Sequence, residues 1–316
     1  MIRCRHVALA LVGVVLGAPT VVAGQGGAVT LRAGNDLFAV RGAGPPPDHD
    51  YTAGTRLSLD ARGAPAWARA WLGRAPACGC VASGVGVAQE IYTPRHDSVS
   101  GPPPGDRPYA GVLVAEGYVR RVGPTRVRTL ALRAGVVGPP AQAGAVQNGL
   151  HRLLHNREEL GWSHQLATAP VFALSYDDTR VAEHPLGATL TRVALGWSAS
   201  AGTLRTGAAL GVRGWLGRSA SLPWSPHAPY GGRVLSAYLV GGCRGDAVAH
   251  DATLDADPRP ADARVRRLPF VAECELGAGG RGRAWGVEYR YVRRGREYRA
   301  QPAAHAYGAI ALTLVR

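Results

Sequence analysis

The sequence predicts an all-β fold, an antiparallel transmembrane β-barrel of about 12 strands. Twelve segments with alternating side-chain character recur from residue 28 to the end of the chain, and an even number of strands is typical of barrels in the bacterial outer membrane. The chain also begins with a segment typical of exported proteins. No later segment has the roughly eighteen uninterrupted apolar residues that a transmembrane helix needs.

Residues 1–23 have the three parts of a cleaved signal peptide. Arg3 and Arg5 form a charged start, an apolar stretch follows, and the segment ends on the small-residue sequence Val21-Val22-Ala23. We expect cleavage after Ala23, which leaves residues 24–316 as one barrel domain. Removing Arg3 and Arg5 lowers the formal charge from +14 to +12. The expected location is therefore the outer membrane of a Gram-negative cell.

The twelve predicted strands are separated by connections of uneven length, as barrel loops are. Residues 189–201 show the pattern clearly, because Thr191, Val193 and Leu195 alternate with the small or polar Arg192, Ala194 and Gly196. One face is therefore suited to lipid and the other to a lumen. The predicted ranges are 28–38, 51–60, 84–93, 110–121, 126–137, 169–177, 189–201, 203–217, 233–243, 268–276, 283–293 and 303–315.

The alternating pattern also bears on the choice between a barrel and a sandwich, and on the membrane interfaces of the wall. A soluble β-sandwich also alternates, but export and the even number of segments of roughly ten residues favour the barrel. Aromatic residues in the second half would form girdles at the membrane interfaces. These are Trp197, Trp215, Trp224, Tyr230, Tyr238, Trp285, Tyr289, Tyr291 and Tyr307.

One connection carries a helical pattern. Between residues 138 and 168 the period changes to about 3.6, with Val146, Leu150 and Leu153 on one face. Gln147 and His151 are four residues apart, so their side chains lie one turn from each other. We expect a short helix near residues 142–156. A polar helix in an otherwise β protein serves as a cap or as a functional site.

Composition and cysteine content leave alternatives open. The chain contains no lysine, so all 36 basic residues are arginine; genomic base composition explains this, although guanidinium groups also suit lipid phosphates. We expect no nucleic-acid partner.

Export permits disulfides, and a Cys243–Cys274 bridge between neighbouring strands is one option. Cys78 and Cys80 are too close in sequence to pair easily, and a four-thiolate zinc site is not favoured by their spacing.

Polar groups that interrupt the strand pattern gather in the first half of the chain. Familiar catalytic motifs do not account for them. His151 and His155 have the spacing of zinc-protease histidines, but Arg152 stands where the glutamate is needed. A Gly-x-Ser-x-Gly nucleophile motif is absent from the sequence. The polar segments are Asn35-Asp36, Asp50-Tyr51-Thr52-Ala53-Gly54, Gln89-Glu90-Ile91-Tyr92-Thr93-Pro94, Asp106-Arg107-Pro108-Tyr109-Ala110-Gly111, Gly138-Pro139 and Gln147-Asn148-Gly149-Leu150-His151.

In this order the segments resemble the lipid A 3′-O-deacylase family of outer-membrane β-barrels, from about Asn35 to Tyr176. The resemblance implies a calcium-dependent esterase that removes the 3′ acyloxyacyl chain of lipid A, or of lipopolysaccharide, in the outer membrane. It implies that His151 is the general base and Gln147 a polar neighbour on the same helix. We expect a monomer.

The resemblance also implies a set of residues on the barrel wall. Asn35, Asp36 and Thr52 match positions that complete the catalytic site, and Asn35 and Asp36 would help to hold Ca²⁺. The family's calcium glutamate lies six residues after the histidine, where this chain has Arg157, so Glu158 is the expected third ligand. Hard oxygen donors of this kind suit calcium. An imidazole can take a proton from water at neutral pH.

A second class of function remains open. Members of the family carry a lysine in the loop after the Ile-Tyr-x-Pro strand, and this chain has no lysine to supply it. Together with the shifted Glu158, this leaves the alternative of a catalytically inactive barrel that binds lipid or supports the envelope.

Overall fold

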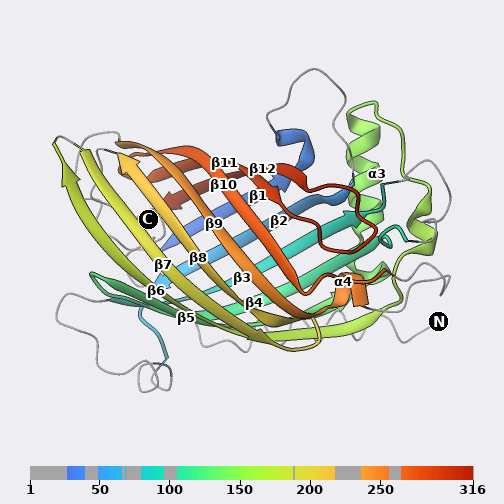
Figure 1. The fold of residues 1–316 in the computed structure, drawn as a ribbon, viewed down its shortest axis with the longest axis horizontal. Helices are drawn as coiled ribbons and strands as arrows, with labels where there is room; N and C mark the ends of the chain where they lie inside the picture. Colours follow the sequence, from blue (N-terminus) through green and yellow to red (C-terminus); the bar gives the residue numbers. More distant parts are fainter. Residues whose placement is uncertain are drawn as a thin grey trace.

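The computed structural model describes residues 27–39, 49–65, 68, 80–95, 105–187, 189–217, 236–255 and 265–315. The expected signal peptide and the residues Cys78, Trp224 and Tyr230 lie outside these ranges. The described strands form one closed barrel in which every strand is antiparallel to its neighbours and β12 pairs with β1 (Figure 1). The predicted fold class and the twelve strands are confirmed.

The observed strands follow the predicted order, and the bounds of most of them lie within four residues of the predicted ones. They are β1 (Ala28–Asn35), β2 (Asp50–Arg62), β3 (Cys80–Thr93), β4 (Ala110–Val122), β5 (Arg126–Val137), β6 (Ala169–Leu186), β7 (Thr189–Ala201), β8 (Arg205–Gly217), β9 (Ser236–Asp251), β10 (Phe270–Arg281), β11 (Trp285–Arg294) and β12 (His305–Val315).

Three strands extend well past their predicted ends, and one of them is β10, which ends at Arg281 rather than at residue 276. β6 continues past residue 177 and β9 past residue 243, through sequences that read as polar turns. Acidic residues in these extensions of β6 and β9 form hydrogen-bonded ion pairs with arginines. Asp178 bonds to Arg126 on the neighbouring strand, and Asp246 bonds to Arg205 and Arg244. Charge alone therefore did not mark the end of a strand here.

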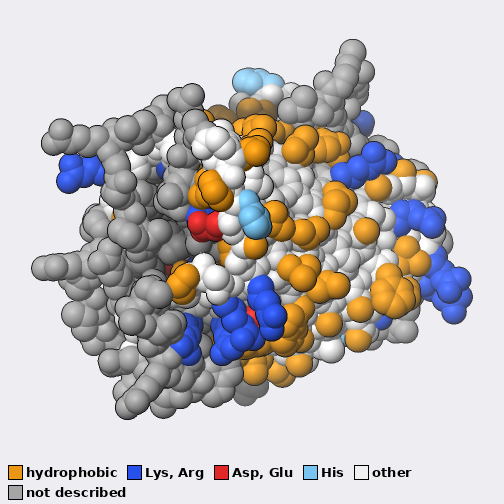
Figure 2. Space-filling view, turned by 60° about the vertical axis from the view of Figure 1, so that its left-hand side comes forward, with side chains coloured by type: hydrophobic (Ala, Val, Ile, Leu, Met, Phe, Trp, Pro, Cys, Tyr) orange, Lys and Arg blue, Asp and Glu red, His pale blue; other side chains and the backbone are white. Residues whose placement is uncertain are grey.

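The two faces of the wall differ as a barrel in a membrane requires. In Figure 2, apolar side chains cover much of the wall, with arginines toward its borders. The lumen is lined by arginines, carboxylates and small residues. Among the described residues, no helix has the length and apolarity needed to cross a membrane. Exposed apolar side chains of the strands include Leu31, Leu57, Leu132, Phe172, Leu195, Leu239, Leu276 and Leu312.

The prediction of aromatic girdles is wrong for three of its residues. Trp215, Tyr238 and Tyr307 line cavities of the lumen, because their places in the alternation put them on the inner face. Trp197 and Trp285 are exposed large side chains, as a girdle residue would be.

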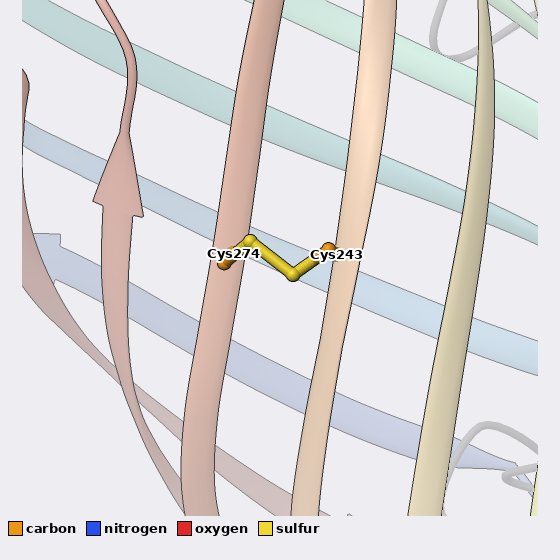
Figure 3. Close-up of a disulfide and its surroundings, with 2 residues drawn as sticks. All are labelled: Cys243 and Cys274. Atoms are coloured by element: carbon orange, nitrogen blue, oxygen red, sulfur yellow. A yellow bond between two sulfur atoms is a disulfide. The ribbon is translucent and has the colours of Figure 1, made fainter.

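Cys243 and Cys274 form a disulfide between neighbouring strands (Figure 3). The two residues are direct partners in the register of β9 and β10, and their Cα atoms lie 4.0 Å apart. On β9 the even-numbered Tyr238, Val240 and Arg244 face the lumen, whereas Leu239 is exposed. Cys243 alternates in step with Leu239, so the disulfide lies on the outer face of the wall. The bridge is the one that the sequence left open as an option.

The remaining elements gather at one end of the barrel, where β1, β3 and β5 end. A 3-10 turn, η1 (Asp36–Phe38), follows β1, and the β5–β6 connection holds η2 (Pro139–Ala141), α3 (Ala143–Leu153) and η3 (Gly161–His164). The helix α4 (Ala252–Asp255) follows β9. Figure 1 shows α3 standing at this end. The predicted helix is confirmed, although it ends at Leu153 rather than near residue 156.

Candidate functional site

The antiparallel order brings the predicted site residues to the same end of the barrel. Asn35 ends β1, Thr52 lies near the start of β2, and Gln147 and His151 lie on α3 after the end of β5. The first residue of α3, Ala143, packs in a cluster with Tyr109, Ile91 and Trp162, and Ala53 packs against this cluster. The helix therefore meets the barrel wall beside Thr52.

Two main-chain hydrogen bonds hold the helical connection on the barrel. The N–H of Gly138 donates to the carbonyl of Gly111 at 2.8 Å, and the N–H of Leu166 donates to the carbonyl of Tyr109 at 2.9 Å. The side chain of Gln89 donates to the carbonyl of Ala141 at 2.7 Å. Both ends of the segment, and the turn η2 that leads into α3, are thus tied to β3, to β4 and to the residue before β4, which gives the helix a fixed position.

Close approach of α3 to the wall depends on Gly111. A Cβ atom at Gly111 would lie 2.5 Å from the Cβ of Ala143 and 3.2 Å from that of Ala141. Both of these residues are buried. Larger side chains at any of these positions would push the helix away from β4.

His151 is buried, and its orientation is set by a neighbouring carbonyl group. The Nδ1 atom lies 2.6 Å from the carbonyl oxygen of Arg157. A carbonyl oxygen can only accept, so Nδ1 carries the hydrogen and the neutral ring has its lone pair on Nε2. This is the tautomer that a histidine needs to accept a proton at Nε2.

Gln147 belongs to a buried polar cluster beneath the helix. Its Oε1 accepts a hydrogen bond from the indole N–H of Trp162 at 2.9 Å. The rings of Trp162 and Tyr109 lie 5.1 Å apart, and the Tyr109 hydroxyl donates to Glu159 at 2.7 Å. Asn148 bonds to both main-chain polar groups of Glu159. The polar residues of α3 thus hold the returning chain in place.

Asn35 and Asp36 stand at the end of β1. The Oδ1 of Asn35 accepts from the N–H of Leu37 at 2.7 Å and so caps η1. Asp36 is 2% exposed. This burial is uncommon for an aspartate, and it is consistent with a functional role for the Asn-Asp pair.

Thr52 is the additional residue of a β-bulge. In the β2–β3 register Tyr51 pairs with Tyr92 and Ala53 pairs with Ile91, so Thr52 has no opposite residue. Its hydroxyl lies 2.6 Å from that of Thr93, and both residues are buried. Bulges redirect a side chain and are common next to active sites.

Glu158 is not buried, in contrast to Asn35, Asp36 and Thr52. Its side chain is exposed, and its carboxylate bonds to Arg152 at 3.0 Å. The buried carboxylate of the segment is that of Glu159, which the sequence did not predict because Glu159 does not interrupt a local pattern. The structure therefore puts Glu158 in a different environment from Asn35 and Asp36.

The donor set is only partly suited to calcium. Asn35 and Asp36 offer an amide and a carboxylate oxygen, and calcium prefers such ligands. Among the described residues, no three His, Cys, Asp or Glu side chains are arranged to hold a metal ion. A calcium site here would need main-chain oxygens or water, or a movement of Glu158.

A second buried network closes the same end of the barrel, and no functional role was predicted for it from the sequence. Arg107 is fully buried and donates to Glu297 and to Thr253, each at 3.3 Å. Tyr298 donates to Asp50 at 3.3 Å and to Asp106 at 3.2 Å. These residues come from three separate connections and from the start of β2, so periodicity within one segment could not have joined them.

The comparisons with known proteins agree with this fold. The chain matches the family model described as outer membrane protein LpxR over residues 7–315. No curated protein sequence matches it. The structure is similar to LpxR from Salmonella typhimurium, with a TM-score of 0.74 and 18% sequence identity over 91% of this chain and 99% of that one.

Two autotransporter barrels are less similar. The β domain of BrkA from Bordetella has a TM-score of 0.47 at 12% identity, covering 91% of this chain and 97% of that one. The translocator domain of NalP from Neisseria meningitidis has a TM-score of 0.41 at 11% identity, covering 98% of this chain and 95% of that one. The family match spans nearly the whole sequence, so this chain belongs to the LpxR family of outer membrane proteins.

Proposed function

We propose that this protein is an outer-membrane ester hydrolase that removes the 3′ acyloxyacyl chain of lipid A, with His151 as the general base. The observation that carries the proposal is the bond from Nδ1 of His151 to the carbonyl of Arg157, which leaves the basic lone pair on Nε2. The helix that holds the buried His151 lies in a segment that is bonded to the barrel at both of its ends. Membership of the family supports lipid A as the substrate.

The reaction needs one base and no protein nucleophile. A water molecule attacks the ester carbonyl while Nε2 of His151 takes its proton. The tetrahedral intermediate then expels the sugar oxygen, which regains the proton from the imidazolium. The products are the free acyloxyacyl acid and an alcohol on the sugar. Gln147 has a positioning role, because its bond to Trp162 fixes the helical turn that precedes His151.

We also propose calcium as the cofactor, with Asp36 and Asn35 as ligands. A bound calcium ion would polarise the ester carbonyl and stabilise negative charge on its oxygen. Thr52 would border the same site from the bulge in β2. Glu158 would join as a ligand only after leaving Arg152.

Expression in a Gram-negative host whose lipid A carries the 3′ chain tests the activity. Wild-type protein should produce lipid A that lacks the mass of that chain, and a chelator added to purified enzyme should stop the reaction. His151→Ala should abolish the product while the barrel still shows heat-modifiable migration on a gel. His155→Asn is the matched control, because His155 is exposed and has a positive φ of 58° that asparagine tolerates.

The alternative is a catalytically inactive barrel that binds lipid. It is favoured by the Glu158–Arg152 pair and by the absence of lysine. Unchanged lipid A masses, with the wild-type barrel folded and calcium supplied, would support this alternative and contradict the esterase.

A further inference from the structure

The lumen contains a cavity of about 380 Å³ whose charged lining is unbalanced. Eight arginines and five glutamates line it, and the other lining residues are uncharged. The arginines are Arg32, Arg56, Arg133, Arg205, Arg213, Arg244, Arg290 and Arg294, and the carboxylates are Glu90, Glu273, Glu275, Glu288 and Glu297.

Carboxylates around this cavity are shared between arginines. Glu275 forms ion pairs with both Arg213 and Arg290. Glu116 likewise forms ion pairs with both Arg56 and Arg133. Arg290 also pairs with Glu288, so the group around Glu275 is balanced, and Arg294 pairs with both Glu273 and Glu297. Glu116, in contrast, faces two positive charges.

A carboxylate on β9 is also shared between two arginines. Asp246 forms ion pairs with Arg205, at 3.2 Å, and with Arg244, at 2.7 Å. Both arginines line the cavity, whereas Asp246 lies outside its lining. Here too one carboxylate faces two arginines, which adds to the positive surplus of the lining.

Arg32 has no carboxylate of its own. Its side chain is exposed to the cavity, and among the described residues no carboxylate lies within ion-pair distance of its guanidinium group. Arg290, Arg56 and Arg213 act on it as like charges, and Glu288 is the principal opposite charge. Guanidinium groups gathered in a confined space repel one another unless an anion lies between them.

We propose that this cavity binds a small oxyanion, of the phosphate or sulfate type, with Arg32 as its principal ligand. The planar fork of arginine matches two oxygens of such an anion. Arg56, Arg213 and Arg290 line the same cavity and supply the surrounding positive charge. The barrel is closed by pairing of β12 with β1, so a lipid headgroup cannot enter through the wall and the anion comes from water.

Titration calorimetry of the folded protein in uncharged detergent tests the site. Sodium phosphate is added at constant ionic strength in calcium-free chloride buffer. Wild type should show saturable binding, and Arg32→Gln should bind about tenfold more weakly or not at all. Arg283→Gln is the matched control, since Arg283 is exposed in the β10–β11 turn outside the lining and should leave binding unchanged.

Thermal unfolding supplies a second readout with a distinctive pattern. Without phosphate, Arg32→Gln should unfold at a higher temperature than wild type, because one repelling charge has gone. Phosphate should raise the unfolding temperature of wild type and leave that of the variant unchanged. If Arg32→Gln does not fold, Arg32→Lys keeps the charge but loses the fork and should bind phosphate several-fold more weakly.

Three results would overturn the proposal. The first is wild-type protein that responds to phosphate no more than to chloride. The others are Arg32→Gln or Arg32→Lys with wild-type affinity. Each of these results is independent of whether the protein hydrolyses lipid A.

Discussion

The side chain of His151 donates from Nδ1 to the main-chain carbonyl of Arg157, six residues further along, at 2.6 Å. This contact closes the end of α3, because the N–H of Asn156 also bonds back to the carbonyl of His151 at 2.8 Å. The turn that follows the helix thus fixes the imidazole by its main chain. The residue type at position 157 has little influence on the contact, since the partner is a carbonyl oxygen.

This contact predicts the tautomer of His151. At a pH where the ring is neutral, Nδ1 should be protonated and Nε2 should not. Nitrogen-15 NMR of histidine-labelled protein in detergent measures the two ring nitrogens, and the His151→Gln spectrum identifies the signals by difference. Protonation at Nε2 of the neutral ring would remove the basis for assigning the base.

The close contact between Gly111 and Ala143 predicts that small changes of volume at this point impair activity. Gly111→Ala adds a Cβ that would lie 2.5 Å from that of Ala143, so α3 must move away from β4. A displacement of about 1 Å can reduce catalysis by about 100-fold. Deacylation should fall by that order in a lipid A assay, while the barrel still folds.

Gly149→Ala is the matched control on the same helix. A Cβ at Gly149 meets no atom within 4 Å, and alanine is the better helix former, by roughly 0.5–1 kcal/mol. This variant should keep wild-type activity. Loss of activity in both variants would indicate general damage to the helix and contradict the argument from the contact.

The pair between Arg152 and Glu158 predicts how calcium affinity responds to mutation. If Glu158 is a ligand, Arg152→Ala releases its carboxylate and should lower the calcium concentration needed for half-maximal activity by several-fold. Exposed pairs of this kind contribute about 0–1 kcal/mol, so the release should not affect folding. Glu158→Gln should raise that concentration. An unchanged calcium dependence in both variants would exclude Glu158 as a ligand.

Much of the barrel was predictable from sequence because its wall obeys a period of two with apolar and polar faces. Leu31 pairs with Leu57 on one side and with Leu312 on the other, and all three are exposed as a lipid-facing row requires. The pattern was less informative where the lumen face carries charge. The end of β9 was missed for this reason, since Asp246, beyond its predicted end, lines a cavity of the lumen.

The candidate site was only partly predictable. Asn35, Thr52 and His151 are all placed at one end by the alternation of strand directions. The bulge at Thr52 and the burial of Glu159 depend on pairing between strands and on contacts across the chain. A single sequence does not show such contacts, because neither residue interrupts a local period.

The buried pair of Arg107 and Glu297 predicts the behaviour of the protein in acid. Burial raises the pKa of Glu297, but the charges of Arg294 and Arg107 outweigh it, so its pKa lies below the ordinary value of 4.5. A carboxylate with a lowered pKa stabilises the fold at pH values above 4.5, and this contribution is lost as pH falls through the lowered pKa. The urea midpoint of the folded barrel should therefore fall below pH 4.5. Removing one partner of a buried pair costs roughly 3–5 kcal/mol of unfolding free energy, so Glu297→Gln should lower the urea midpoint at pH 7. It should also weaken the dependence of the midpoint on acid.

The exposed Glu158→Gln serves as the control and should shift the midpoint little. An acid dependence that is identical in wild type and Glu297→Gln would assign it to other carboxylates.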